Sequence, residues 1–314
     1  MKLSIVIPCY NEEAVLPKTN EVLLSVLFDL IEKGKISETS SICYIDDGSS
    51  DKTWQIIEAY ITQDDHISGL KLSRNWGHQN ALLAGLFNTS GDILVSIDAD
   101  LQDDVHAIEQ MIDTYEKGYD IVYGVRNDRA TDTRWKHQTA EMFYRLLACL
   151  GVKVIYNHAD YRLMSRRAVN ALKDYREVNL FLRGLIPLIG FRSSVIYYKR
   201  GSRVAGKSKY PFRRMLALAW NGITSLSIVP LRCITIIGCL TFLLSIAMGM
   251  YVLGIRIFTD RAIPGWASIL VSVYFLGGIQ LFCIGILGEY LGKVFNETKM
   301  RPRFLIEQKC GTNI

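Results

Sequence analysis

The chain has 314 residues, a formal net charge of +5 and a hydrophobic content of 49%. This length admits one large domain or two ordinary ones, and so small a charge excess gives no reason to expect nucleic acid as a partner. The seven cysteines are scattered without a CxxC pair, which excludes a disulfide framework or a cysteine zinc site and favours a reducing compartment. The apolar run at the N-terminus is too short for a signal peptide and is broken by Pro8, so we expect the first domain in the cytoplasm.

Residues 1 to about 125 alternate short apolar runs with longer amphipathic stretches, a pattern typical of repeated β-α units. Strands are expected at 3–8, 41–46, 70–72, 92–98 and 120–125, and helices at 12–32, 51–62, 78–89 and 104–117. The nearly continuous apolar character of several strands favours a parallel sheet that is covered on both faces. The prediction is a doubly wound α/β sheet with its ligand beyond the carboxyl ends of the strands. Polar pairs follow three of these ends: Asn11–Glu12, Asp46–Asp47 and Asp98–Asp100.

The segment from about 126 to 200 is expected to contain helices at 135–150, 165–173 and 179–189. The last of these begins the sequence "NLFLRGLIPLIGF", which is unusually apolar for a surface helix. A packed core helix and a helix lying on a membrane surface are both compatible with this pattern.

Two long uncharged runs, 233–255 and 262–288, each reach the roughly 20 residues that span a bilayer. They predict a two-helix transmembrane region over 231–292, preceded by a juxtamembrane amphipathic helix at 211–230 and followed by a cytoplasmic tail at 293–314. Basic residues are denser outside the pair than between the two runs, so both chain termini are expected in the cytoplasm, with the catalytic domain at 1–210. Gly278, Gly285 and Gly292 recur every seven residues and predict a face for close helix packing, within or between chains.

The stretch "SIDADLQDD" at 96–104 places four aspartates in nine residues at the end of an apolar run. Asp98 and Asp100 are two positions apart and would face the same side of a regular strand, where they can converge on one ion. Magnesium prefers oxygen ligands and commonly takes one or two carboxylates, with water and substrate phosphates completing its shell. Gln102 offers a further oxygen. A solvated acidic turn is the alternative, but the two other polar strand ends nearby favour a metal and nucleotide-sugar site.

Six motifs then occur in order: "SIVIPCYNEE", "YIDDGSSDKT", "SRNWGHQNALLAGL", "DADLQDD", "ADYRLMSRRAV" and "RVAGKSKY". Together they resemble family 2 glycosyltransferases of the GT-A (Rossmann-like) fold, and more narrowly the polyprenyl-phosphate glycosyltransferases, such as the bactoprenol glucosyltransferases and dolichyl-phosphate mannose synthases. The two apolar runs and the segment "LGEYLGKVFNETKMRPRFLI" are similar to the bacterial bactoprenol branch. The resemblance covers nearly the whole chain.

This resemblance implies roles for individual residues. The nucleotide-sugar pocket would be formed by Pro8, Tyr10, Asn11, Glu12, Asp46, Arg74 and Asp98, and the metal, Mg²⁺ or Mn²⁺, by Asp98, Asp100 and Gln102. Asp160 matches the position assigned as catalytic base, although Ala159 stands where many relatives carry glycine. For His78, a surface or core role is the simpler expectation, with contact to the donor as the alternative.

The implied reaction joins two anions, a UDP-sugar and a lipid phosphate. Two charges of −2 at roughly 5 Å repel by about 3 kcal/mol in water and about 13 kcal/mol at an effective dielectric near 20, so the acceptor phosphate needs cations of its own. The basic segment 198–210 supplies them, and the residues expected to bind the lipid phosphate are Arg200, Arg203, Ser208 and Lys209. A general attraction of this segment to anionic lipid is the alternative. Arg126 and Arg129 are weaker candidates for the same role.

The expected function is inverting transfer of a hexose, with glucose preferred, from a UDP-sugar to undecaprenyl phosphate at the cytoplasmic face of the bacterial inner membrane. The partners expected with it are a separate flippase, a downstream glycosyltransferase and a second copy of the chain. The alternatives are UDP-GlcNAc, an amino-arabinose nucleotide or GDP-mannose as donor, and a non-enzymatic membrane scaffold. Because a lipid phosphate is largely dianionic at pH 7, Asp160 either abstracts a proton or orients the substrates. The absence of a QxxRW motif disfavours a processive synthase.

Overall fold

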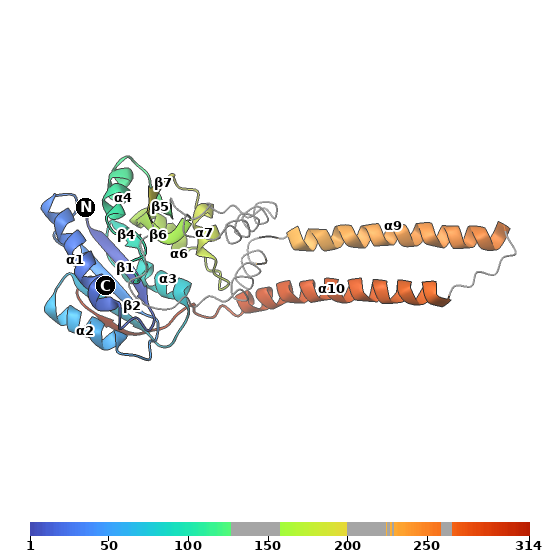
Figure 1. Ribbon diagram of the computed structural model, residues 1–314, viewed down its shortest axis with the longest axis horizontal. Helices are drawn as coiled ribbons and strands as arrows, with labels where there is room; N and C mark the ends of the chain where they lie inside the picture. Colours follow the sequence, from blue (N-terminus) through green and yellow to red (C-terminus); the bar gives the residue numbers. More distant parts are fainter. Residues whose placement is uncertain (127–157, 200–223, 225–226, 228, 259–265) are drawn as a thin grey trace.

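The computed structural model describes residues 1–126, 158–199, 224, 227, 229–258 and 266–314. These residues form an α/β domain and two long antiparallel helices, which project side by side from the same side of the domain (Figure 1). The helix expected at 135–150 and nearly all of the amphipathic helix expected at 211–230 lie outside the described residues.

One eight-stranded sheet organises the α/β domain, in the order β7-β5-β6-β4-β1-β2-β3-β8. Its strands are β1 (Leu3–Cys9), β2 (Ser41–Asp46), β3 (Ile67–Leu72), β4 (Ile93–Ser96), β5 (Ile121–Arg126), β6 (His158–Ser165), β7 (Ser193–Tyr198) and β8 (Ile306–Cys310). The four central strands β3, β2, β1 and β4 are parallel, as the apolar runs predicted. The carboxyl ends of these strands meet at one edge of the sheet.

Two strands outside the predicted strand ranges run in the opposite direction to the parallel strands. Strand β6 runs antiparallel to both of its neighbours, β4 and β5, and β8 runs antiparallel to β3. The sheet is therefore mixed. Because β6 is antiparallel to β4, the start of β6 lies beside the end of β4. This reversal brings Asp160, near the start of β6, close to the carboxyl edge of the parallel strands.

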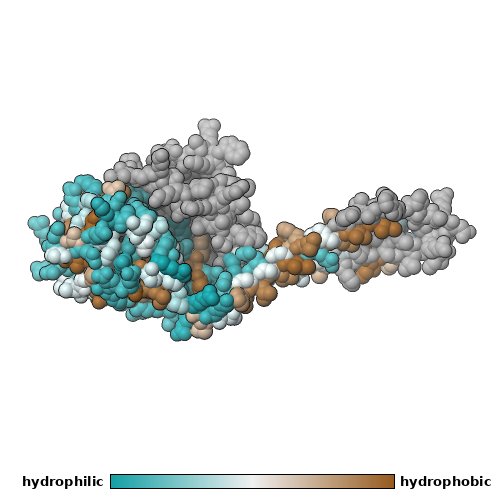
Figure 2. All heavy atoms as spheres, turned by 90° about the horizontal axis from the view of Figure 1, so that it is seen from below, coloured by the Kyte–Doolittle hydropathy of each residue, from teal (hydrophilic) through white to brown (hydrophobic). Residues whose placement is uncertain are grey.

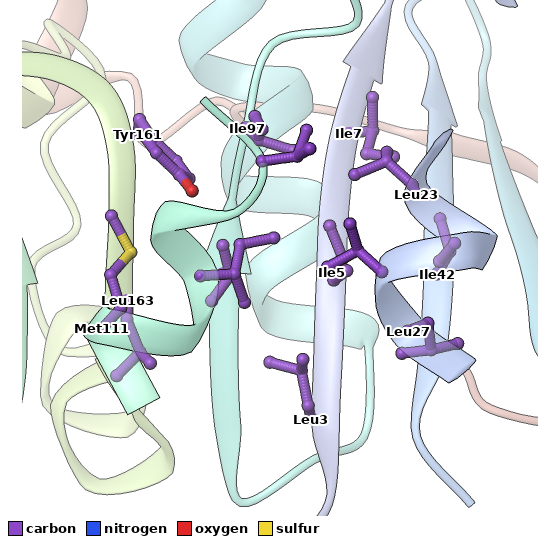
Figure 3. Close-up of a cluster of buried hydrophobic side chains, with 14 of the residues drawn as sticks. Leu3, Ile5, Ile7, Leu23, Leu27, Ile42, Ile97, Met111, Tyr161 and Leu163 are labelled. Atoms are coloured by element: carbon purple, nitrogen blue, oxygen red, sulfur yellow. The ribbon is translucent and has the colours of Figure 1, made fainter. Parts of the chain in front are cut away.

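Helices cover both faces of the sheet because alternate side chains of each strand point to opposite sides. On one face Leu3, Ile5 and Ile7 pack with residues of α1 (Leu16–Glu32), α2 (Thr53–Gln63) and α4 (Ala107–Glu116) (Figure 3). On the other face Val6 and Ile45 pack with α3 (His78–Asn88), α6 (Arg166–Lys173) and α7 (Leu182–Leu188).

The apolar segment that begins at residue 179 is a core helix over part of its length. Leu182, Leu185 and Ile186 of α7 are buried in the second core cluster, whereas Leu188 is 54% exposed. The sequence left open a packed core helix and a helix on a membrane surface, and the burial of these side chains supports the core helix.

The two long helices, α9 (Val229–Phe258) and α10 (Trp266–Thr298), carry large apolar side chains on their surfaces (Figure 2). Leu244 is 59% exposed on α9, and Leu281 and Leu291 are 72% and 70% exposed on α10. Within the described part of the chain, one stretch, Phe275–Thr298, is long and apolar enough to cross a membrane, and α9 contributes a shorter apolar stretch, Val229–Thr241. The structure thus supports one of the two predicted spans.

The segment predicted as a separate cytoplasmic tail belongs in part to the α/β domain. Helix α10 continues to Thr298, and β8 then adds to the edge of the sheet beside β3. The backbone N–H of Ser73 donates to the carbonyl of Leu305 at 3.0 Å, and Lys2 Nζ donates to Asn313 Oδ1 at 2.9 Å. The edge of the sheet beside β3 is thus completed by residues that follow the long helices, beyond the predicted domain boundary at residue 210.

Candidate active site

The loops after β1 and β2 are joined by side-chain and backbone hydrogen bonds. Asn11, with φ of 54°, donates its N–H to Ser49 Oγ at 3.0 Å and accepts the N–H of Ser50 at Oδ1, 2.9 Å away. The N–H of Glu12 donates to Thr53 Oγ1 at 2.9 Å. These two predicted nucleotide-pocket residues thus fix the shape of the edge where the strands end.

Two other residues predicted for the nucleotide pocket differ sharply in exposure. Pro8 is buried within β1, whereas Tyr10 is 42% exposed just beyond the end of that strand. The Tyr10 ring is therefore accessible to a ligand, whereas the Pro8 side chain is not.

Asp46 and Asp47, at the end of β2, organise the surrounding loops. The Asp46 side chain is buried and accepts the N–H of Ser49 at 3.3 Å, and burial raises its pKa. Asp47 accepts the N–H groups of Trp76 and Gly77 at 2.7 and 2.9 Å, and burial raises its pKa as well. Asp47, which is not among the predicted site residues, therefore holds the β3–α3 loop against the end of β2.

The β3–α3 loop carries Arg74, one of the predicted nucleotide-pocket residues. Its guanidinium lies over the Trp76 ring at 4.1 Å from the ring centroid, and the residue is exposed to solvent. Gly48, with φ of 65°, lies so close to the Arg74 backbone that a side chain at this position would collide with it. The loop is thereby fixed, while the guanidinium stays accessible to a ligand.

The acidic motif lies on a loop and not on a strand. β4 ends at Ser96, so the expectation that Asp98 and Asp100 share one face of a regular strand is wrong. The loop turns instead at Leu101, which has φ of 53°, and the N–H of Gln102 donates to Asp100 Oδ1 at 3.2 Å. The Asp98 side chain is 37% exposed, whereas Gln102 is buried.

His78, the first residue of α3, lies between the two carboxylates on which the prediction depends. Its Nε2 atom is 3.5 Å from Asp98 Oδ1 and 3.7 Å from Asp160 Oδ2. Burial opposes a charge on this imidazole, but the carboxylates of Asp160 and Asp98 outweigh it and raise the pKa of His78 to about 9. Partial burial and nearby carboxylates raise the pKa of Asp98, against the effect of His78. His78 thus lies at the surface, between two carboxylates that the sequence predicts for the site.

Asp160 is enclosed by cations. Its carboxylate pairs with Arg162, and Arg183 Nη2 of α7 lies 3.3 Å from Asp160 Oδ2. Burial alone would raise the pKa of Asp160, but Arg183, His78 and Arg162 together hold it well below the ordinary value. Its backbone carbonyl accepts from Ser96 Oγ at 2.6 Å, which ties β6 to the end of β4.

Arg162 and Arg183 are not among the residues that the sequence predicts for the site. The Arg162 side chain is 1% exposed, and its Nε and Nη1 atoms have no hydrogen-bond partner among the described residues. Such a buried cation is stabilised chiefly by its pairing with Asp160. The signal in the sequence is the ADYR motif itself, in which the arginine lies two residues after the aspartate and therefore on the same face of β6.

A second ion pair fixes the outer side of the acidic loop. Asp103, whose side chain is 1% exposed, accepts from Arg126 Nη2 at 2.9 Å and also from the Tyr198 hydroxyl. Arg126, a weaker candidate for binding the acceptor phosphate, is thus engaged in holding this loop against β5 and β7. The stronger candidates for the acceptor phosphate, and Arg129, lie outside the described residues: Arg200, Arg203, Ser208 and Lys209.

The donor set at the acidic loop fits a hard divalent cation that is shared with a substrate. No group of three histidine, cysteine, aspartate or glutamate side chains forms a metal cage in the described part of the chain. Asp98 and Asp100 nevertheless offer carboxylate oxygens at the partly exposed end of β4. Magnesium and manganese in nucleotide sites commonly use one or two carboxylates and complete their shells with phosphate oxygens and water.

The helix-covered sheet, with an acidic loop at the end of a central parallel strand, places the protein in the GT-A class of glycosyltransferases. The chain belongs to glycosyl transferase family 2, whose model matches residues 4–173. It is 49% identical over 307 residues to the uncharacterized glycosyltransferase YkoT of Bacillus subtilis, covering 97% of this chain and 91% of that protein. It is 40% identical over 310 residues to the bactoprenol glucosyl transferase of Shigella phage SfX, covering 98% of this chain and all of that protein.

A solved structure with a similar arrangement is glucosyl-3-phosphoglycerate synthase of Mycobacterium tuberculosis, crystallised with Mn²⁺, UDP and phosphoglyceric acid. The similarity has a TM-score of 0.49 at 20% identity and covers 72% of this chain and 77% of that one.

Proposed function

We propose that this glycosyltransferase moves glucose from UDP-glucose to undecaprenyl phosphate at the cytoplasmic face of the membrane. The observation that carries the proposal is the full-length similarity to bactoprenol glucosyl transferases, at 39–40% identity over 98–100% of this chain. The geometry is compatible with it, because a nucleotide-sugar type of site and long helices with exposed apolar side chains occur in the same chain.

The residues at the carboxyl edge of the sheet divide the work of binding the donor. Tyr10 and Arg74 are exposed and would contact the base, ribose or diphosphate, while Asn11, Glu12 and Asp46 shape the pocket. Asp98 and Asp100, with Gln102 beside them, would hold Mg²⁺ or Mn²⁺ together with the diphosphate. When bound, that ion supplies positive charge that stabilises the departing UDP.

The reaction needs little proton abstraction. A lipid phosphate has a second pKa near 6 and is largely dianionic at pH 7. A phosphate oxygen forms the new bond to the anomeric carbon as the bond from that carbon to UDP breaks, and UDP leaves with the electron pair. A single displacement of this kind inverts the configuration, so an α-linked donor gives a β-linked lipid phosphosugar.

Asp160 is suited to orienting the substrates more than to taking a proton. Effective general bases have pKa values near the working pH, whereas the surrounding cations hold the pKa of Asp160 well below its ordinary value. A carboxylate that is ionised at neutral pH, beside His78 and Arg183, can instead accept hydrogen bonds from sugar hydroxyls and fix the two guanidinium groups.

We further propose that both long helices cross the membrane, so that α9 and α10 form a two-span anchor with the catalytic domain and both termini in the cytoplasm. Arg232 lies in the first turn of α9 and Lys299 directly follows α10, so basic residues occur at the ends of the pair nearest the α/β domain, which favours this orientation. The glycines at 278, 285 and 292 offer a close-packing face for a homo-oligomer. A lipid-linked glucose made on this side needs a separate flippase and a downstream glycosyltransferase before it decorates a surface glycan.

The test offers the purified full-length protein a panel of UDP- and GDP-sugars with undecaprenyl phosphate and Mg²⁺, and identifies the lipid product by mass and by NMR of its anomeric centre. We expect one product, β-linked glucosyl undecaprenyl phosphate. If the product formed from UDP-GlcNAc, an amino-arabinose nucleotide or GDP-mannose instead, that nucleotide sugar would be the donor and UDP-glucose would not. An α-linked product would contradict the single displacement. Absence of transfer from every donor would favour a scaffold.

A further inference from the structure

The acceptor phosphate needs a cation near the anomeric carbon, and one described residue stands in the right place to supply it. Arg183 lies on the first turn of α7, with its guanidinium 3.3 Å from Asp160 Oδ2 through Nη2 and 3.5 Å from Asp160 Oδ1 through Nε. Asp160 in turn faces His78, which contacts Asp98 of the predicted metal site. Arg183 is therefore adjacent to the groups that would surround the donor diphosphate and its sugar.

The exposure of the two arginines around Asp160 separates their roles. The Arg162 side chain is 1% exposed, so no substrate reaches it and it serves as the fixed counterion of Asp160. The Arg183 side chain is 36% exposed, and its contacts with the carboxylate are at the long end of the hydrogen-bond range. A planar guanidinium with this access can turn its N–H groups toward a phosphate and bind it through two parallel hydrogen bonds.

The position of α7 links this arginine to the membrane helices. At its start, the N–H of Leu182 donates to Gln79 Oε1 at 3.0 Å, so the helix is attached beside His78 of α3. Just before it, the N–H groups of Val178 and Asn179 both donate to the carboxylate of Glu297 at 2.9–3.0 Å. Glu297 lies at the end of α10, within the stretch that is long and apolar enough to span a bilayer.

The segment that carries Arg183 therefore contacts both α3, beside His78, and the end of α10. A lipid phosphate is confined to the headgroup level of the membrane and must approach the donor from that direction. The guanidinium is held close enough to Asp160 to be oriented before the acceptor arrives, which lowers the entropic cost of binding it.

We propose that Arg183 binds the phosphate group of the lipid acceptor. This inference rests on the proposed function and adds a residue to it: the acceptor phosphate is held by the α7 arginine and not by the basic segment 198–210 alone. In the proposed function the nucleotide and diphosphate of the donor are bound by the loops after β1, β3 and β4, so loss of Arg183 should weaken acceptor binding more than donor binding.

The test measures steady-state transfer by the full-length protein with Arg183→Gln and Arg183→Lys, varying each substrate in turn. We expect Arg183→Gln to raise the KM for undecaprenyl phosphate about 10- to 100-fold, the range expected when charge-assisted hydrogen bonds are lost. The KM for UDP-glucose should stay within about twofold. Arg183→Lys keeps the positive charge but loses the planar pair of N–H donors, so it should give an intermediate KM for undecaprenyl phosphate.

Arg176→Gln is the matched control, because Arg176 is an exposed arginine on the same α6–α7 connection with no contact to Asp160 among the described residues. It should leave both KM values unchanged. Equilibrium binding of a short-chain polyprenyl phosphate to each variant gives a second readout that does not require turnover, and it should weaken in parallel with the KM.

A fall in kcat with the acceptor KM and acceptor binding unchanged would overturn the inference, since Arg183 would then act only through Asp160. Equal rises in the KM for donor and acceptor would overturn it as well. Failure of the wild-type protein to transfer any sugar to a polyprenyl phosphate would instead contradict the proposed function, so the two failures are distinguishable.

Discussion

The α/β domain buries its large aliphatic side chains, whereas the two long helices expose side chains of the same kind. In the sheet, Leu3, Ile5 and Ile7 are fully buried against helices. On α9 and α10, the exposed large apolar side chains, Leu244 and Leu281 among them, are 40–72% exposed. Contiguous apolar surface of this extent is rare on soluble monomers. The first region is stabilised by its own packing, whereas in the proposed membrane anchor the two helices would be stabilised by contact with lipid.

The largest difference between the two regions is expected for buried charge. The α/β domain contains an ion pair that a lipid-facing surface would not tolerate. Asp160→Ala leaves the buried Arg162 without its counterion and should lower the free energy of unfolding by roughly 3–5 kcal/mol. Denaturant unfolding of the full chain in detergent, followed by tryptophan fluorescence, measures the change. The double variant Asp160→Ala/Arg162→Met should recover much of the loss, and a double variant as unstable as the single one would contradict the role given to this pair.

The second prediction compares truncation of an apolar side chain in the two regions. Ile5→Ala removes methyl groups from a close-packed core and should lower the free energy of unfolding of the α/β domain by roughly 2–5 kcal/mol. Leu281→Ala removes a side chain that touches little protein, and the same unfolding transition should change by less than about 0.5 kcal/mol. Equal effects would show that the helices and the sheet unfold as one unit.

Glycines offer a third, smaller contrast. A methyl group at Gly85 of α3 would collide with Val6 and Ile45 across the sheet, so Gly85→Ala should destabilise the α/β domain by roughly 1–3 kcal/mol. Among the described residues, nothing lies within 4 Å of the same added atom at Gly285 of α10. Gly285→Ala should therefore leave the domain unchanged. Loss of a cross-linked dimer in Gly285→Ala membranes would show that the glycine face packs against a second copy.

The smallest expected effect is a pH dependence. Because Asp160 has a lowered pKa in the folded state, its stabilising contribution is complete above the ordinary aspartate pKa near 4 and is lost as the pH falls toward the folded value. Between pH 6 and pH 3 the α/β domain should lose about 1 kcal/mol through this group. The Asp160→Asn variant should lack that part of the slope, so identical acid profiles for the two proteins would contradict the assignment.

Much of the sheet follows from the sequence alone because local apolar pattern determines it. Strands β1, β2 and β5 are close to their predicted ranges, since each is a short apolar run between helices. β6 is not predictable in this way, because its sequence contains Asp160 and Arg162 and its pairing with β4 and β5 joins residues far apart in the chain. β8 is a polar edge strand, IEQKC, whose partner β3 lies more than 200 residues earlier.

The candidate site, like the sheet, is predictable from the sequence only where a local pattern marks its residues. Asp98 and Asp100 follow a recognisable apolar strand, and the motif resemblance adds Asp160. The central position of His78 and the presence of Arg183 depend on how α3 and α7 pack against the sheet, which no local pattern specifies. Arg183 also belongs to a segment whose apolar character draws attention to its leucines and not to its single charge.

The central claim is that an acidic loop at the end of β4 supports metal-dependent sugar transfer to a lipid. The most direct measurement compares transfer by wild type, Asp98→Asn and Asp104→Asn, a matched control in the same loop, as a function of Mg²⁺ and Mn²⁺ concentration in membranes. We predict that Asp98→Asn lowers the rate by on the order of 10²–10³-fold with the protein still folded, that Asp104→Asn stays near wild type, and that chelation abolishes transfer. Full activity of Asp98→Asn, or transfer that is indifferent to divalent ions, would contradict the account.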